Sequence, residues 1–117
     1  MGLHRLSIDG KDVIFTNTWR GTRSGFAHET ELFIDGWRAS AARCSYINRT
    51  WERYSYQSVM LQAVHILQEE ETAREKAYFL QLNGYKNMMS HRKAAFMEYL
   101  ANNKTLAFYK KIEEALR

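Results

Sequence analysis

The sequence contains no proline and a single cysteine in 117 residues. Cys44 alone cannot form an internal disulfide, and no spacing of cysteine and histidine resembles a zinc site. No apolar run approaches the roughly 18 residues that a membrane-spanning helix needs, and the N-terminus lacks the hydrophobic stretch of a signal peptide. We therefore expect a cytoplasmic protein with no metal, no other cofactor and no membrane partner.

The composition is that of an ordinary globular chain, with 45% hydrophobic and 26% charged residues. No linker or low-complexity segment divides it, so we expect a single domain over residues 1–117. A chain of this length buries only about two thirds of the surface that it exposes when unfolded, which argues against a deep cleft between two lobes. Large multi-domain enzymes are excluded.

Two Asp-Gly pairs, Asp9-Gly10 and Asp35-Gly36, lie between short runs rich in β-branched and aromatic residues. This dipeptide favours the positive φ angles of a two-residue turn, so the sequence predicts β-hairpins over residues 3–17 and 26–47.

Two-residue turns also fix the strand register. In the first hairpin the predicted pairs are Ile8 with Lys11, Leu6 with Val13 and His4 with Phe15. In the second they are Ile34 with Trp37, Leu32 with Ala39, Thr30 with Ala41 and His28 with Arg43. This register leaves five side chains on the solvent face, namely Phe33, Arg38, Glu31, Ser40 and Glu29.

From residue 56 the hydrophobic period changes from two toward 3.6, which predicts a strong helix with Ser55 as its N-cap. The helix either runs to Leu82, with Asn83-Gly84 as its stop, or breaks at Thr72. A Glu70–Arg74 pair favours the longer helix, and the run 69–71 predicts a solvated acidic face.

Two further helices are predicted, one near 94–100 after a Ser90 cap and one near 106–116. The predicted fold is therefore α+β. A four-stranded antiparallel sheet from two β-hairpins (1–54) is followed by a C-terminal bundle of two to four helices (55–117).

This topology brings two separate segments together at one end of the second hairpin. Loop 18–25 precedes the third predicted strand and segment 48–53 follows the fourth, so both lie opposite Asp35-Gly36. Basic and aromatic side chains are concentrated at this rim. The candidate partner-binding residues are Trp19, Arg20, Arg23, His28, Arg43, Asn48, Arg49, Trp51, Arg53 and Tyr54.

Arginines interleaved with aromatic rings suit a phosphate backbone with unstacked bases, and they suit an acidic protein surface equally. Residues 1–55 hold seven Arg and one Lys, which also favours contacts in the first half of the chain. A structural interpretation stays open, in which Trp19 and Trp51 close the end of the core and the arginines extend outward.

A second basic zone falls in the helical half, where lysine-rich faces are usually only solvated. Its residues are Lys86, Arg92, Lys93, Lys104, Lys110 and Lys111. The run 83–89, which contains Tyr85 and two methionines, either packs into the core or forms an adaptable contact surface.

The sequence favours no enzyme. Its four histidines are scattered, and none accompanies a nucleophile or paired carboxylates in a recognisable pattern. One exception is considered: His28 beside Arg43 would stay neutral and would serve as the base of a small nuclease.

Segments TNTWRGTRSGFAH (16–28) and YINRTWERYSYQSVM (46–60) resemble small, mostly uncharacterised proteins that phages and mobile elements of Gram-positive bacteria carry. The likeness covers roughly residues 14–67. Proteins of that origin include anti-CRISPR inhibitors, which typically bind an effector nuclease or its guide RNA without catalysis. Many of these inhibitors are acidic DNA mimics, whereas this chain has a net charge of +4.

The resemblance and the basic charge together predict a non-enzymatic binding protein. It would contact RNA, DNA or a nucleoprotein, and would inhibit a host defence nuclease such as a Cas effector by occlusion. Two alternatives remain, namely a homodimeric structural or interaction module that binds no nucleic acid, and a small nuclease centred on His28.

Overall fold

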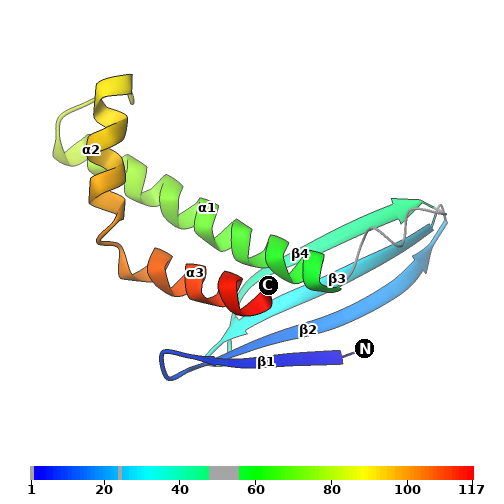
Figure 1. The fold of residues 1–117 in the computed structure, drawn as a ribbon. Coiled ribbons are helices and arrows are strands. Elements are labelled where there is room, and N and C mark those ends of the chain that lie inside the picture. The colour runs from blue at the N-terminus through cyan, green and yellow to red at the C-terminus, as the bar shows by residue number, and fades with distance from the viewer. Residues whose placement is uncertain (1, 24, 48–55) are drawn as a thin grey trace.

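The computed structural model describes residues 2–23, 25–47 and 56–117, in which a four-stranded sheet is followed by three helices (Figure 1). The strands are β1 (Gly2–Ile8), β2 (Lys11–Thr22), β3 (Gly25–Ile34) and β4 (Trp37–Ile47). The helices are α1 (Tyr56–Leu82), α2 (Ser90–Leu100) and α3 (Lys104–Leu116). The sheet is antiparallel with strand order β1-β2-β3-β4, which confirms the predicted α+β fold.

Both Asp-Gly turns adopt the left-handed backbone that the sequence predicts. The φ angles are 51° at Asp9 and 78° at Gly10, and 48° at Asp35 and 84° at Gly36. Positive φ at both central residues matches the right-handed twist of the flanking strands. The register of the first hairpin is as predicted, with Leu6 opposite Val13.

The second hairpin departs from the predicted register because β4 contains one extra residue. Phe33 lies opposite Arg38, but a β-bulge between Leu32 and Phe33 then leaves Ala39 without a partner in the β3–β4 ladder. A bulge of this kind sets two residues of one strand against one of the other. The predicted pairs Leu32 with Ala39, Thr30 with Ala41 and His28 with Arg43 are therefore wrong, and the observed partners are Ser40, Ala42 and Cys44.

The bulge reverses the predicted faces of the β4 residues that follow it, as Ser40 and Arg43 show. Ser40, predicted on the solvent face, is buried, and its hydroxyl donates a hydrogen bond to the Ala63 carbonyl of α1 at 2.8 Å. Arg43, predicted beside His28, lies opposite Glu29 instead.

Helices α1 and α3 pack together on one face of the sheet (Figure 1). The core between them is formed by side chains that alternate along β2 and β3 and by one stripe of each helix. Its fully buried members include Val13, Phe15, Leu32, Val64 and Ile112. No described element covers the opposite face, which we call the open face.

Helix α1 is continuous to Leu82, so of the two alternatives the longer helix is the one observed, without a break at Thr72. Gly84 follows the helix at φ 68°, and the Tyr85 amide donates to the Leu80 carbonyl at 2.8 Å. This arrangement is a Schellman motif, which confirms Asn83-Gly84 as the stop. No helix in the described residues is long and apolar enough to cross a membrane.

Three details of the helices were predicted incorrectly. Arg74 pairs with Glu71 rather than Glu70, and Glu71 is buried rather than solvated. Ser90 is the first residue of α2, and the N-cap position belongs to Met89, whose side chain makes no cap hydrogen bond. Ser55 falls outside the described residues.

Helix α1 extends past the sheet, and α2 lies at its far end (Figure 1). Phe79, Phe96 and Tyr99 pack together there, with ring centroids 5.4–6.3 Å apart. The radius of gyration is 17.1 Å, whereas a compact domain of this length has about 13 Å. The molecule is therefore elongated, with α2 as a projection.

Candidate partner-binding surface

The structure distributes the predicted rim residues over both faces of the sheet. Successive side chains of a strand point to opposite faces, so Trp19 and Arg20 are separated. Trp19 and His28 share the helix side with the core residues, and Arg20 and Arg43 lie on the open face. Arg23 is exposed in the turn between β2 and β3. Five predicted residues lie outside the described ranges, namely Asn48, Arg49, Trp51, Arg53 and Tyr54.

On the open face one carboxylate contacts two arginines. Oε1 of Glu29 lies 3.1 Å from Nη2 of Arg20 and 3.4 Å from Nε of Arg43. Glu29 is opposite Arg43 on β4 and diagonal to Arg20 on β2, which is the spacing at which cross-strand charges meet. We call these residues the Glu29 triad. Two guanidiniums against one carboxylate leave an excess positive charge.

The triad remains accessible to solvent and to a partner. The side chains of Arg20 and Arg43 are 62% and 47% exposed. Two other ion pairs on the same face are balanced, since Arg38 pairs with Glu31 at 2.6 Å and Arg5 pairs with Asp12 at 3.1 Å. Among these ion-paired groups, the excess charge of the open face is therefore at the triad.

A hollow of about 440 Å³ lies beside the triad. Its lining combines hydroxyls, carboxylates and guanidiniums from three strands. The polar lining residues are Thr16, Thr18, Glu29, Thr30, Glu31, Arg38 and Arg43. Such a surface can donate hydrogen bonds to an anion through the arginines and threonines and can accept them through the glutamates.

The aromatic residues gather on the helix side, at the end of the sheet near the start of α1. Trp19 packs edge-on against Phe26 with ring centroids 5.7 Å apart, and His28 lies 4.6 Å from Tyr56. Trp19 remains 55% exposed, so its role is not that of a buried core plug.

His28 differs from the prediction in the residue opposite it and in the cause of its lowered pKa. Its partner in the ladder is Cys44, while Arg43 points to the other face. The pKa of His28 is lowered because burial disfavours the charged imidazolium. The predicted repulsion from Arg43 is therefore not the reason.

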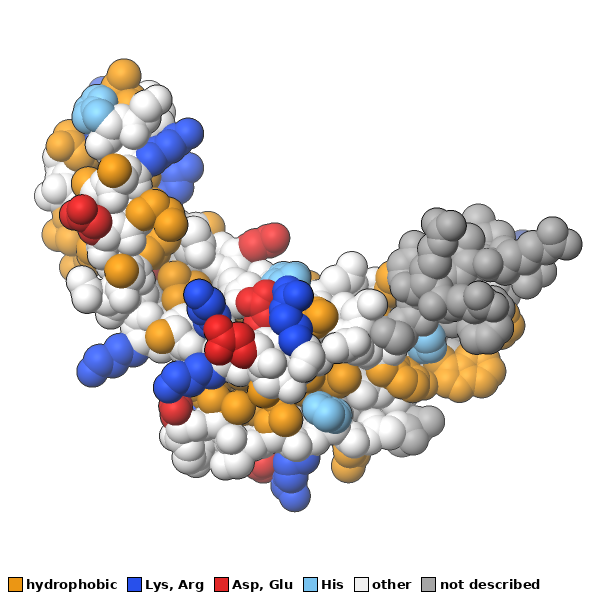
Figure 2. Space-filling view, in the orientation of Figure 1, with side chains coloured by type: hydrophobic (Ala, Val, Ile, Leu, Met, Phe, Trp, Pro, Cys, Tyr) orange, Lys and Arg blue, Asp and Glu red, His pale blue; other side chains and the backbone are white. Residues whose placement is uncertain are grey.

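The second basic zone is not one patch. Lys86, Arg92 and Lys93 belong to the α2 end, while Lys104, Lys110 and Lys111 belong to α3. On the face drawn in Figure 2, Lys and Arg side chains are scattered along the helices and interspersed with Asp and Glu.

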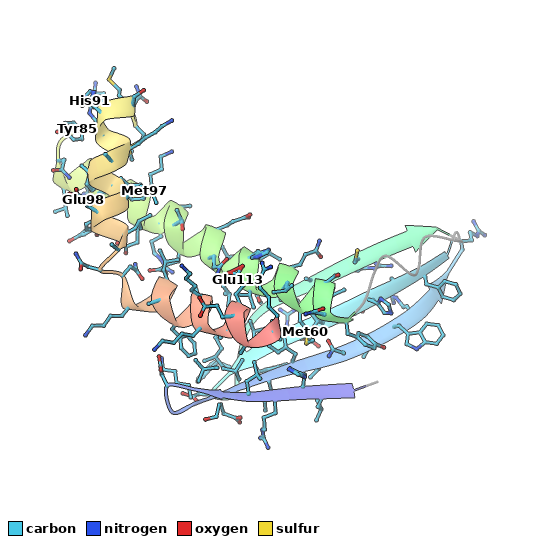
Figure 3. All side chains as sticks on the ribbon, viewed as in Figure 1. Met60, Tyr85, His91, Met97, Glu98 and Glu113 are labelled. Carbon is cyan, nitrogen blue, oxygen red and sulfur yellow. The ribbon has the colours of Figure 1, made fainter. Side chains whose placement is uncertain are left out.

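Two of these cations have internal partners. Lys111 bonds to both carboxylate oxygens of Asp9 at 2.9 and 3.0 Å. Arg92 lies 3.6 Å from the ring centroid of Tyr85 and donates to the Asn87 carbonyl at 2.6 Å. Tyr85 lies at the end of the molecule away from the sheet (Figure 3).

The run 83–89 does not pack into the core, since Tyr85 and Met89 are exposed and Met88 is half-buried. The exposure of this run is consistent with a contact surface and not with core packing.

Glu29 is the main residue that the sequence prediction missed. It was assigned to the solvent face as an ordinary charge, and its contact with Arg43 depends on the bulge. The predicted loop 18–25 is also wrong, because β2 continues to Thr22 and β3 begins at Gly25. Strand alternation in this extension of β2 separates Trp19 from Arg20.

The described residues hold no group of three or more His, Cys, Asp or Glu side chains that would bind a metal ion. Comparisons with protein-family models, with curated proteins and with solved structures found no match to this chain.

Proposed function

We propose that this chain is a non-enzymatic binding protein that contacts a nucleic acid or a nucleoprotein through the Glu29 triad and the neighbouring Arg23. The carrying observation is that two exposed guanidiniums share a single carboxylate on a sheet face that no described element covers. The excess charge and the spare N–H donors favour an anionic partner.

An incoming phosphate competes with Glu29 at small cost. Exposed ion pairs contribute only about 0–1 kcal/mol each, whereas hydrogen bonds between arginine and phosphate are charge-assisted and often bidentate. A phosphate of the partner would therefore replace Glu29 as the ion-pair partner of Arg20 and Arg43, and the sheet would stay folded. Thr18, which lies opposite Glu29 on β2, would supply a neighbouring hydroxyl.

The proposed mechanism is occlusion, in which the sheet covers phosphates or the nucleic-acid groove of a protein. The resemblance of residues 14–67 to phage and mobile-element proteins makes a host defence nuclease, such as a Cas effector with its guide RNA, the first partner to test. The net charge of +4 favours RNA or an acidic protein surface over mimicry of DNA.

The test compares two double variants with the same change in net charge. Arg20→Gln with Arg43→Gln removes the triad cations, and Arg5→Gln with Lys111→Gln removes two balanced cations that do not line the hollow beside the triad. Binding of labelled single-stranded RNA and DNA is measured between 50 and 300 mM salt. The triad variant should lose at least about tenfold in affinity, and its slope of log affinity against log salt should fall by about 1.4.

The control variant should change affinity by less than about threefold. Equal losses in the two variants would assign binding to net charge alone and would contradict the role of the triad. Recording the same mixtures with and without Mg²⁺ detects any cleavage, which would support the small nuclease instead.

A second candidate function is supported by the exposed apolar side chains near α2. They are Tyr78, Leu82, Tyr85, Met89 and Met97, each at least 37% exposed. A contact surface of this kind would serve a homodimeric interaction module without nucleic acid. Sedimentation at 50 and 500 mM salt separates the two, because a hydrophobic dimer hardly responds to salt.

A further inference from the structure

The outer edge of β4 is unpaired in the described part of the chain. With the order β1-β2-β3-β4, the described residues of β4 pair with a single strand, β3, and the 11 residues of β4 make it longer than the 7-residue edge strand β1 (Figure 1). Proteins usually protect long edges with lysine, proline, inward charges or β-bulges, and of these β4 has the bulge at Ala39, directly after Arg38. Between Arg38 and Arg43, β4 has only Ala39, Ser40, Ala41 and Ala42.

Hollows adjoin this stretch on both sides of the strand. The open-face hollow of about 440 Å³ and a second one of about 410 Å³ share Ala41, Ala42 and Arg43 in their linings. The second hollow lies between β4 and α1, where it is also lined by His65 and Ile66. Alternate side chains of an added strand point to opposite faces, so they would enter the two hollows in turn.

The charges of β4 indicate which kind of strand could pair with its outer edge. Residues 37–47 contain two arginines and no acidic residue. An antiparallel second copy of β4 would bring four arginines onto one edge, and like charges on neighbouring strands are destabilising. A strand with acidic residues would instead place carboxylates beside Arg38 and Arg43.

We propose that the edge of β4 accepts an extended, acidic segment of a partner protein as a fifth strand. Main-chain hydrogen bonds to β4 supply the affinity. Carboxylates reaching the open-face hollow, and an apolar side chain reaching Ile66 on the helix side, supply the specificity. This surface goes beyond the proposed contact with nucleic acid, because it recognises a polypeptide backbone.

The experiment measures hydrogen exchange of backbone amides by NMR on the full chain. The probe is a seven-residue peptide of alternating valine and glutamate with blocked ends, and the matched control replaces each glutamate with lysine. At millimolar concentration the acidic peptide should slow exchange of the outward amides within residues 40–43 by at least about tenfold. The basic peptide should leave them unchanged.

Two variants of equal charge locate the site. Ala41→Glu adds an acidic residue at the edge and should weaken binding of the acidic peptide at least about tenfold. Ser7→Glu adds one on β1, the opposite edge strand, and should change it less than about twofold.

Three results would overturn the proposal. The first is an absence of protection by the acidic peptide, and the second is equal protection by the basic peptide. The third is protection of residues 40–43 that rises with protein concentration alone, because this would assign the edge to a second copy. RNA that protects the same amides equally well would also overturn it. The two proposals share Arg43 and are distinguished by their probes, because the Arg20 and Arg43 double variant is tested with RNA and the edge variants are tested with the peptide.

Discussion

Asn103 and Glu71 connect the start of α3 to the middle of α1. Nδ2 of Asn103 donates to Oε1 of Glu71 at 3.2 Å, while Oδ1 of Asn103 accepts from the Leu106 amide at 2.8 Å. Arg74 pairs with the other carboxylate oxygen. One side chain therefore caps a helix and also satisfies a carboxylate that is only 7% exposed.

Replacing Asn103 with alanine should destabilise the fold by about 1–3 kcal/mol. The loss of an N-cap costs about 0.5–2 kcal/mol, and a buried carboxylate that loses a donor adds a desolvation penalty. Urea unfolding measures the change. Asn102→Ala, one residue earlier and exposed, is the control and should stay within about 0.5 kcal/mol. Equal losses of stability in Asn103→Ala and Asn102→Ala would contradict the role of Asn103 in connecting α3 to α1.

The sequence predicted the parts of the fold that depend on local chemistry. Asp9-Gly10 and Asp35-Gly36 determine the turns through their backbone conformations, and the period of 3.6 after residue 56 identifies α1. The burial of Glu71 and its contact with Asn103 could not be predicted from local sequence. Its burial depends on Asn103, which is 32 residues away and reaches it only when α3 folds back along α1.

The candidate surface was only partly predicted, because it also depends on contacts between residues that are distant in the sequence. Arg20 and Arg43 were both selected for their type and approximate position, but their contact with Glu29 requires the correct register. The register depends on an unpaired Ala39, and nothing in the side chain of an alanine distinguishes a bulge from a regular pair.

The contribution of Glu113 to stability should depend on pH. Its carboxylate accepts hydrogen bonds from His65, Gln68 and Arg117 at 3.1–3.2 Å, and lies between α1 and α3 (Figure 3). These bonds, with that from His65 first, lower its pKa from 4.5 to about 2. A lowered folded-state pKa means that the unfolded chain binds the proton more readily. The stabilisation is therefore complete above pH 4.5 and is lost as the pH falls toward 2.

Glu113→Gln is the variant that tests this contribution. Wild type should exceed the variant in urea midpoint at pH 6, and the difference should shrink steadily between pH 5 and pH 2.5. A difference that stays constant over this range would show that Glu113 acts by packing rather than by charge.

Replacing the buried polar pair Asn17 and Thr30 with apolar residues should stabilise the fold. The two residues are cross-strand partners on the helix side and are 5% and 2% exposed. Within the described residues, Oδ1 of Asn17 and Oγ1 of Thr30 have no hydrogen-bond partner, and Nδ2 of Asn17 reaches only the Met60 sulfur at 3.5 Å. An unsatisfied buried polar group costs about 1–3 kcal/mol.

Thr30→Val keeps the shape of the side chain and should raise the urea midpoint, and adding Asn17→Leu should raise it further. Thr16→Val, on the open face, serves as the control and should have little effect. A lower midpoint for Thr30→Val would mean that its hydroxyl has a partner that stabilises the fold.

Deleting single residues from β4 should distinguish the bulge from the regular ladder. Removal of Ala39 leaves Phe33 opposite Arg38 and Leu32 opposite Ser40, so every later pair is preserved and the strand becomes regular. Removal of Ala41 keeps the bulge and shifts every later residue by one, which turns Arg43 toward the helix side and away from Glu29. An unpaired charge buried there costs about 3–5 kcal/mol. The Ala39 deletion should therefore unfold cooperatively near the wild-type urea midpoint and keep the RNA affinity that we propose for the Glu29 triad. The Ala41 deletion should lower both the urea midpoint and the affinity for RNA. If instead the Ala39 deletion were the more damaging of the two, the ladder would be regular and the triad would form by another register.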